Sequence, residues 1–194
     1  MVRLWQRALR RAGIPLAYSK GYNPRPRISM AAPLALGVTS EAELMDVFIE
    51  KQMSPHLFEF AVLKQLPKGV SIIQVNEVPL SLPSLQSVIH SAEYLVTVNT
   101  LKTRKQVEGL LSNLLTTTRL PWHHQRDKDM RSYDLRALVY DLQLLKYQDS
   151  NCVIGMRLRC DSTGSGRPEQ VCLALGFKEA PELIHRTKLN FSSN

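Results

Sequence analysis

The order of the predicted elements constrains the fold of this chain more than any other feature, because it nearly repeats. In the second half, hydrophobic patterns predict a strand at 92–98, a helix at 103–115, paired strands at 136–145 and 153–160, a helix at 167–175 and a strand at 184–191. In the first half they predict a helix at 2–12, strands at 28–36 and 43–49, a helix at 54–66 and a strand at 70–78. The second order, βαββαβ, is that of the ferredoxin-like split unit, and the first is the same order without its initial strand.

We therefore expect an α+β fold of two tandem ferredoxin-like halves, the first lacking its N-terminal strand. Residues 1–80 form the truncated half with a basic face, 81–91 a linker that begins within the proline-rich stretch 79–83, and 92–194 the second half. The helix at 2–12 begins without a capping residue or a preceding strand, so we also expect an upstream element to be missing.

Basic charge is concentrated near the N-terminus. Residues 1–40 contain seven basic residues and no acidic residue, and so carry most of the net charge of +8. The seven are Arg3, Arg7, Arg10, Arg11, Lys20, Arg25 and Arg27. Such a segment favours an anionic partner, most commonly nucleic acid. The alternative is a domain edge whose acidic neighbours belong to another chain or to a missing segment.

The stretch from Tyr18 to Arg27 is the strongest local candidate for a binding site. Pro24 and Pro26 forbid a helix and impose an extended path, on which Arg25 and Arg27 point the same way. Each guanidinium can hold a phosphate, and neighbouring tyrosines can stack on unpaired bases. The predicted RNA-binding residues are Arg3, Arg7, Arg10, Arg11, Tyr18, Lys20, Tyr22, Asn23, Arg25 and Arg27. The alternative is a proline-rich edge strand with solvated arginines.

A second basic stretch, 119–136, is open to two interpretations. It is either a second nucleic-acid contact or, as we favour, a solvated loop. Around Trp122 it gathers Arg119, His123, His124, Arg126, Lys128 and Arg131, with Asp127, Asp129 and Asp134 among them. The adjacent histidines His123 and His124 are badly spaced for two metal ligands on one face.

Other features limit the function classes. The three cysteines, Cys152, Cys160 and Cys172, lack metal-ligand spacing and favour core thiols in a reducing compartment. No apolar run is long enough to span a bilayer and no secretory signal is visible, so we expect a cytoplasmic protein without a membrane partner. We predict no metal site and no cofactor in this chain.

Catalytic residues are not identifiable from the pattern. The candidates for a general base are Lys20, His123, His124 and His185. The carboxylates Glu41, Glu43 and Asp46 fit strand capping and solubility better than acid–base chemistry, and pairing with the arginines of the first helix is the open alternative. We expect no catalytic activity in this chain alone.

Two runs of the sequence carry a resemblance to a known family. They are RALRRAGIPLAYSKGYNPRPRIS, residues 7–29, and APLALGVTSEAEL, residues 32–44. Together they resemble the bacterial radical-SAM-linked protein family, a domain of unknown function, over residues 2–80 and more loosely beyond. Its members stand alone or form the C-terminal part of proteins with cobalamin-binding-like and radical-SAM domains. Stand-alone members are often encoded near ribonuclease E/G and ribosomal-protein genes, which implies RNA metabolism or translation.

The chain departs from the family pattern in three places. The family's first strand and its Ser-His-Leu-Asp-type turn are absent, Arg25 stands where the family often has histidine, and the radical-SAM cysteine motif is missing. The resemblance thus implies that a partner or fused radical-SAM domain carries the iron–sulfur cluster and S-adenosylmethionine.

The first hypothesis is therefore an accessory RNA-binding or substrate-presenting domain that works with a radical-SAM enzyme in RNA modification or translation-related metabolism. The second is a protein-interaction domain that docks on an acidic partner surface. The third is a metal-independent RNA-processing or RNA-modifying enzyme.

Overall fold

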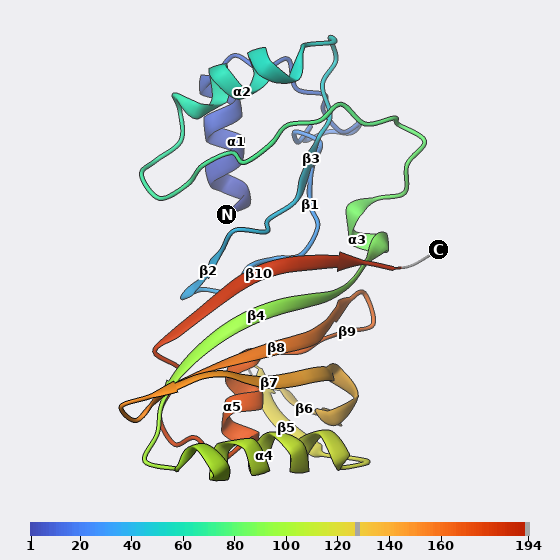
Figure 1. Ribbon diagram of the computed structural model, residues 1–194. Coiled ribbons are helices and arrows are strands. Elements are labelled where there is room, and N and C mark those ends of the chain that lie inside the picture. Colours follow the sequence, from blue (N-terminus) through green and yellow to red (C-terminus); the bar gives the residue numbers. More distant parts are fainter. Residues whose placement is uncertain (127–128, 193–194) are drawn as a thin grey trace. The chain divides into compact units, whose positions relative to one another are not determined.

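The structure, a computed structural model, describes residues 1–126 and 129–192 and has a mixed α+β fold (Figure 1). The chain divides into two compact units. The N-terminal unit comprises Met1–Pro33 and Leu44–Gln86, and the C-terminal unit comprises Leu34–Glu43 and Ser87–Asn194. The short segment 34–43 of the first half thus belongs with the second half of the chain. The predicted linker at 81–91 stays a prediction.

The N-terminal unit contains two helices and a small sheet. Its elements are α1 (Val2–Arg11), β1 (Ile28–Met30), β3 (Met45–Val47) and α2 (Pro55–Leu63). Strands β1 and β3 pair antiparallel, with Ile28 opposite Val47. The core of this unit is formed by Leu9, Ile14, Leu16 and Val62. The predicted helices are confirmed, and Ser54 caps α2 by accepting a hydrogen bond from the backbone N–H of Leu57 at 3.3 Å.

Gly13 ends α1. Its φ of +68° lies in the left-handed region that glycine adopts most easily. The backbone N–H of Gly13 donates to the carbonyl of Arg10 at 3.1 Å, and that of Ile14 donates to Leu9 at 3.2 Å. This pair of bonds is a Schellman motif, and it turns Ile14 back onto Leu9 in the core.

The C-terminal unit is built on one large sheet. The strand order is β2-β10-β4-β8-β7, with β9 paired to β8. The strands are β2 (Val38–Ser40), β4 (Ile89–Asn99), β7 (Val139–Gln148), β8 (Asn151–Asp161), β9 (Gly164–Ser165) and β10 (Leu183–Phe191). Helices α4 (Arg104–Thr116) and α5 (Pro168–Ala174) lie on one side of this sheet (Figure 1). The remaining helices are short: α3 (Leu85–Val88) and the 3-10 turn η1 (Arg136–Leu138).

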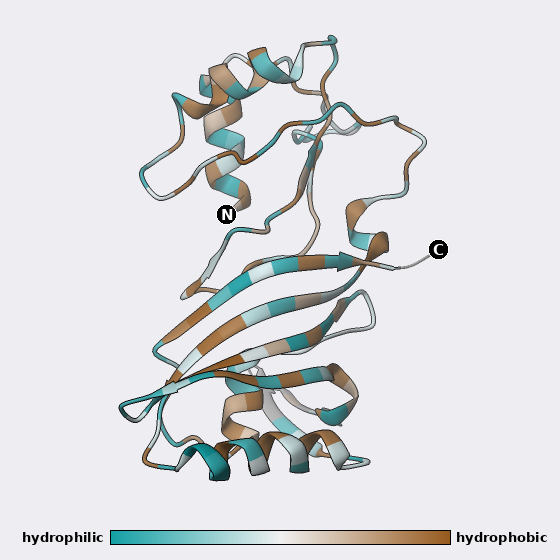
Figure 2. Ribbon diagram, viewed as in Figure 1, coloured by the Kyte–Doolittle hydropathy of each residue, from teal (hydrophilic) through white to brown (hydrophobic). Residues whose placement is uncertain are grey.

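Alternation of side chains along the strands explains the position of this core. On β8 every second residue from Cys152 to Cys160 is buried. Figure 2 shows hydrophobic and hydrophilic residues along the strands of this sheet. Val107, Leu111 and Leu114 cover this face from α4. Helix α4 begins with a capping box in which Thr103 and Gln106 bond to each other's backbone N–H groups.

Three predictions about the fold are wrong. The strand predicted at 28–36 ends at Met30, the last residue of β1, because Pro33 cannot donate a ladder hydrogen bond. Residues 70–78 do not form a strand: the segment has no partner strand, and its apolar side chains divide between Ile72, which packs on the core, and Ile73, which is 75% exposed. The stretch predicted as a solvated loop forms a hairpin of β5 (Pro121–Arg126) and β6 (Asp129–Asp134). From β4 onward the chain has the order βαββαβ once this hairpin, η1 and β9 are set aside, but the tandem ferredoxin-like arrangement is not confirmed.

Candidate nucleic-acid interface

The segment predicted to bind RNA forms a closed loop in the N-terminal unit. Its two ends run antiparallel: the N–H of Ser19 donates to the carbonyl of Arg25 at 2.9 Å, and the N–H of Arg27 donates to Ala17 at 2.8 Å. The hydroxyl of Ser19 also accepts a hydrogen bond from the N–H of Arg25 at 3.0 Å. These bonds close a loop over residues 20–24. We call residues 18–27 the basic loop.

Phe48 anchors the base of the basic loop to the sheet of the same unit. Its carbonyl accepts from the N–H of Ala17 at 2.8 Å, and its N–H donates to the carbonyl of Arg27 at 3.0 Å. The guanidinium of Arg27 lies over the Phe48 ring, 4.2 Å from the ring centroid. A stacked guanidinium still offers its in-plane N–H groups to a ligand. No local sequence pattern points to Phe48, because its partner Arg27 is more than twenty residues away.

All the predicted side chains of the basic loop are exposed. They are Tyr18, Lys20, Tyr22, Asn23, Arg25 and Arg27. Tyr22 is 99% exposed and Tyr18 is 42% exposed, so both rings are open to stacking. Among the described residues, no carboxylate forms an ion pair with Lys20, Arg25 or Arg27. The loop therefore presents aromatic and cationic groups together.

The four arginines of α1 are also exposed, but they divide into two pairs. Arg7 and Arg11 line an open groove of about 520 Å³ together with Lys64, which follows α2. Arg3 and Arg10 do not line it. Lys64 was not among the predicted site residues, and nothing in the local pattern distinguishes it from other surface lysines.

The face of the large sheet that points away from α4 and α5, by contrast, carries a row of balanced charges. Across it, Lys188 lies opposite Glu93, Glu93 opposite Arg157, and Arg157 opposite Asp141. Alternating charges in register stabilise neighbouring strands. Because each cation in this row faces a carboxylate, we do not regard this face as a nucleic-acid platform.

The acidic residues of segment 34–43 pair with β10. Glu43 binds the buried guanidinium of Arg186, with Oε1 2.9 Å from Nε, and Glu41 lies 3.7 Å from Nε2 of His185. The alternative that they pair with the arginines of α1 is therefore wrong for both residues. These contacts hold β2 and its flanking segment to the sheet edge.

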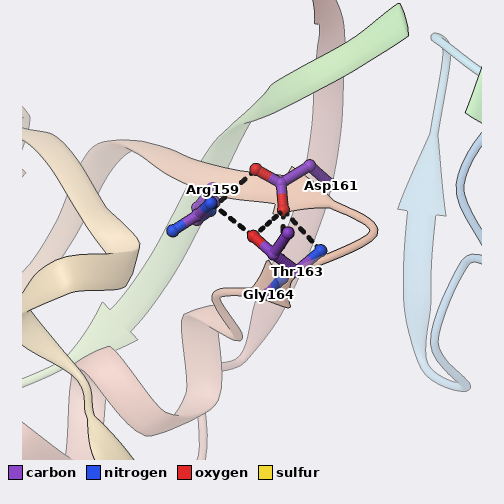
Figure 3. Close-up of polar contacts among 4 residues, drawn as sticks. All are labelled: Arg159, Asp161, Thr163 and Gly164. Carbon is purple, nitrogen blue, oxygen red and sulfur yellow. Dashed lines mark hydrogen bonds and ion pairs between the residues drawn. The ribbon is translucent and has the colours of Figure 1, made fainter. Parts of the chain in front are cut away.

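A compact polar turn joins β8 to β9 (Figure 3). One carboxylate oxygen of Asp161 accepts from the hydroxyl of Thr163 at 2.7 Å and from the N–H groups of Thr163 and Gly164 at 2.8 and 3.0 Å, while the other accepts from Arg159 at 2.7 Å. Burial raises the pKa of Asp161, but these hydrogen bonds outweigh it and lower the pKa to about 2. The cluster is internally satisfied, so it stabilises the turn.

Among the side chains that the structure describes, the predicted general bases Lys20, His123 and His185 do not form a catalytic group. His123 bonds through Nδ1 to the hydroxyl of Ser132, and His185 bonds through Nδ1 to Thr39, both at 2.8 Å. Lys20 lies in the basic loop of the other unit. In the second basic stretch, Asp127 and Lys128 lie outside the described residues, as do the side chains of His124, Arg126, Asp129 and Arg131.

The cysteines are buried thiols on β8 and α5. Burial raises the pKa of Cys152 and Cys160, and raises that of Cys172 to about 12. Within residues 1–126 and 129–192, no three His, Cys, Asp or Glu side chains are grouped to hold a metal ion. In the same ranges, no helix is both long and apolar enough to cross a bilayer.

Comparison with protein families decides what the chain is related to. A family model described as "Uncharacterized protein conserved in bacteria (DUF2344)" matches residues 1–168. The chain belongs to this family. Membership of DUF2344 confirms the part of the resemblance that identified a bacterial domain of unknown function, and extends it over most of the chain.

Comparisons beyond the DUF2344 family add little. A search of curated proteins gives no match. Among solved structures, a chain of the "Crystal Structure of a Cbf5-Nop10-Gar1 Complex" aligns with 54% of this chain, at a TM-score of 0.39 and 11% identity. The alignment spans 32% of that chain, about a third of its length. A likeness of this strength supports no conclusion about fold or function.

Proposed function

We propose that this chain is an accessory RNA-binding domain whose basic loop holds unpaired RNA. The observation that carries the proposal is the exposure of Tyr22 between Lys20 and Arg25 on a loop whose backbone is closed by hydrogen bonds. Single-stranded RNA is bound by rings that stack on bases and by cations that contact phosphates. A closed loop holds both kinds of group ready, which lowers the entropy lost on binding.

An acidic protein surface is the second candidate partner. No described carboxylate pairs with Arg25, and an unpaired cation would suit an acidic protein as well as RNA. A fully exposed tyrosine between the cations favours RNA, because stacking is a contact that bases offer and carboxylates do not. We further propose, from the resemblance to radical-SAM-linked proteins, that the domain acts beside a radical-SAM enzyme in the cytoplasm and presents RNA to it. In this proposal the partner carries the iron–sulfur cluster and S-adenosylmethionine.

The test is titration of a labelled single-stranded RNA with the purified chain at two salt concentrations, followed by fluorescence anisotropy. The double variant Arg25→Ala/Arg27→Ala should weaken binding by about 1–3 kcal/mol, the scale of charge-assisted contacts. Because Arg27 also contacts Phe48, the single variant Arg25→Gln is measured beside it as a variant that leaves that contact intact.

The control is Lys105→Gln/Lys178→Gln, which removes two exposed charges from the C-terminal unit. Weak loss in the control and strong loss in the loop variants supports the proposal. Equal loss in both indicates nonspecific attraction and contradicts it, as does a wild-type chain that fails to bind RNA.

A further inference from the structure

We infer that the groove between α1 and the turn after α2 is a second RNA contact, which binds the phosphate backbone through Arg7, Arg11 and Lys64. This inference rests on the proposed RNA-binding function. It adds a groove outside the basic loop and a further residue, Lys64. The three cations line one groove of about 520 Å³. That volume suits a ligand the size of a nucleotide unit.

The two arginines reach the groove because of their spacing. Residues four apart on a helix lie on the same face, so Arg7 and Arg11 project side by side from α1. Lys64 comes from the other wall, as the residue that follows the last turn of α2. Its ammonium lies 3.8 Å from the centroid of the Phe60 ring, a contact that fixes the side chain without neutralising its charge.

The lining of the groove is suited to an anion with a less polar part. Leu4, Leu66 and Pro67 supply an apolar wall, and none of the described residues that line the groove is a carboxylate. Within the described parts of the chain, none of the three cations forms an ion pair with an acidic side chain. Guanidinium groups bind phosphates with paired hydrogen bonds, and the apolar wall can pack against the sugar.

Helix stability alone does not explain this arrangement. Arg10 and Arg11 lie in the last turn of α1, where cations stabilise the negative end of a helix. Arg7 lies a full turn earlier and Lys64 lies on another element, so the dipole of α1 accounts for neither. A role for the groove in binding accounts for both.

The groove and the basic loop belong to the same unit and are close along the chain. Tyr18 lies seven positions after Arg11, so their Cα atoms lie no more than about 25 Å apart even if the chain between them is fully extended. One RNA strand can therefore contact both sites, its bases on the loop and its backbone in the groove.

The experiment uses the whole chain and a labelled single-stranded RNA of mixed sequence, about 12 nucleotides long, within the usual range of such sites. The variant Arg7→Gln/Arg11→Gln keeps good helix formers in α1. We expect its affinity for this RNA to fall about tenfold at physiological salt. The slope of log K against log salt should become less steep by about 1.4, since each single-strand phosphate contact contributes about 0.7. The matched control, Arg3→Gln/Arg10→Gln, removes the same charge from the same helix outside the groove and should change both quantities much less.

A second measurement locates the RNA without any substitution. Lysine acetylation is followed by mass spectrometry with and without the RNA. We expect RNA to protect Lys64 but not Lys68, which is exposed four residues further on and does not line the groove. Equal acetylation of Lys64 with and without RNA overturns the inference.

The outcomes separate this inference from the proposed function. If the wild-type chain does not bind RNA, both fail. If the Arg25→Gln variant loses affinity while the groove variant and its control both bind normally, only the groove inference fails. If the groove variant binds RNA normally but no longer binds polyglutamate, the groove is a site for an acidic protein and the inference is overturned. If the groove variant and its control weaken RNA binding equally, the contact is with the helix as a whole, and the groove is not the site.

Discussion

Arg186 and Glu43, 143 residues apart in the sequence, form an ion pair inside the C-terminal unit. The Arg186 side chain is only 2% exposed, and the carboxylate of Glu43 is 22% exposed. The hydroxyl of Ser40 donates to the same carboxylate oxygen at 2.7 Å. A guanidinium this deeply buried is tolerated because the carboxylate and its neighbours replace the water that it has lost.

Removal of the Glu43 charge should therefore destabilise the fold. We expect Glu43→Gln to lower the free energy of unfolding by about 3 kcal/mol, because Arg186 is left buried without its counter-ion. The control is Glu41→Gln: its carboxylate is 63% exposed and lies 3.7 Å from His185, so its loss should cost no more than about 0.5 kcal/mol. Urea unfolding followed by circular dichroism measures both. Equal effects of the two variants would show that the buried ion pair contributes no more to the free energy of unfolding than the exposed one.

The turn at Asp161 should make stability depend on acid pH. The hydrogen bonds to its carboxylate lower the pKa from 3.8 to about 2 in the folded state. The resulting stabilisation is present above about pH 4 and is lost as the pH falls through about 2. Near neutral pH we expect the free energy of unfolding of wild type to be higher than that of Asp161→Asn by on the order of 1 kcal/mol. The difference is this small because solvent screens part of the effect. The difference should shrink between pH 4 and pH 2. A difference that stays constant over this range would contradict the prediction.

Two glycines of the C-terminal unit should respond to alanine in opposite directions. A Cβ at Gly166 would lie 2.9 Å from the carbonyl oxygen of Leu138 and 3.0 Å from Cβ of Leu158. Gly166→Ala should therefore destabilise the chain by about 1–3 kcal/mol. Gly109 lies inside α4 with nothing within 4 Å of an added Cβ, so Gly109→Ala should stabilise the chain by about 0.5–1 kcal/mol. Thermal unfolding of the two variants measures whether each change in stability is positive or negative. A Gly166→Ala variant as stable as wild type would mean that Leu138 moves at little cost.

The sequence predicts elements whose signals are local. The Schellman motif at Gly13 and the capping box at Thr103 are contained within a few residues, and the α1 and α4 helices were predicted almost to the residue. In the long strands β4 and β8, the alternation of apolar residues in the sequence corresponds to an alternation of buried side chains in the fold. Residues 70–78 show the same kind of alternation, but a strand also needs a partner with free hydrogen-bonding groups, and the sequence does not show where one lies.

The missed features depend on tertiary structure. The β5–β6 hairpin, built around His123 and its neighbours, lacks the apolar alternation that identifies a strand. Burial of Arg186 depends on Glu43, and the groove depends on Lys64; each partner is remote in the sequence and has no pattern of its own. The exposed residues of the basic loop were predictable because composition, prolines and spacing within ten residues sufficed to identify them.

Salt titrations should distinguish the contribution of base stacking to RNA binding by the basic loop from the contribution of charge. Tyr22 is fully open to solvent, so Tyr22→Ala should not alter the fold, but should weaken binding of single-stranded RNA by about 1–3 kcal/mol through loss of a base-stacking ring. The slope of log K against log salt should stay the same, because no charge is removed. Tyr22→Phe keeps the ring and should bind like wild type. Arg25→Gln should instead reduce the slope by about 0.7, the contribution of one phosphate contact. Fluorescence anisotropy at several salt concentrations gives both quantities. If Tyr22→Ala binds RNA as tightly as wild type, the loop acts through charge alone, and an acidic protein becomes as good a partner for it as RNA.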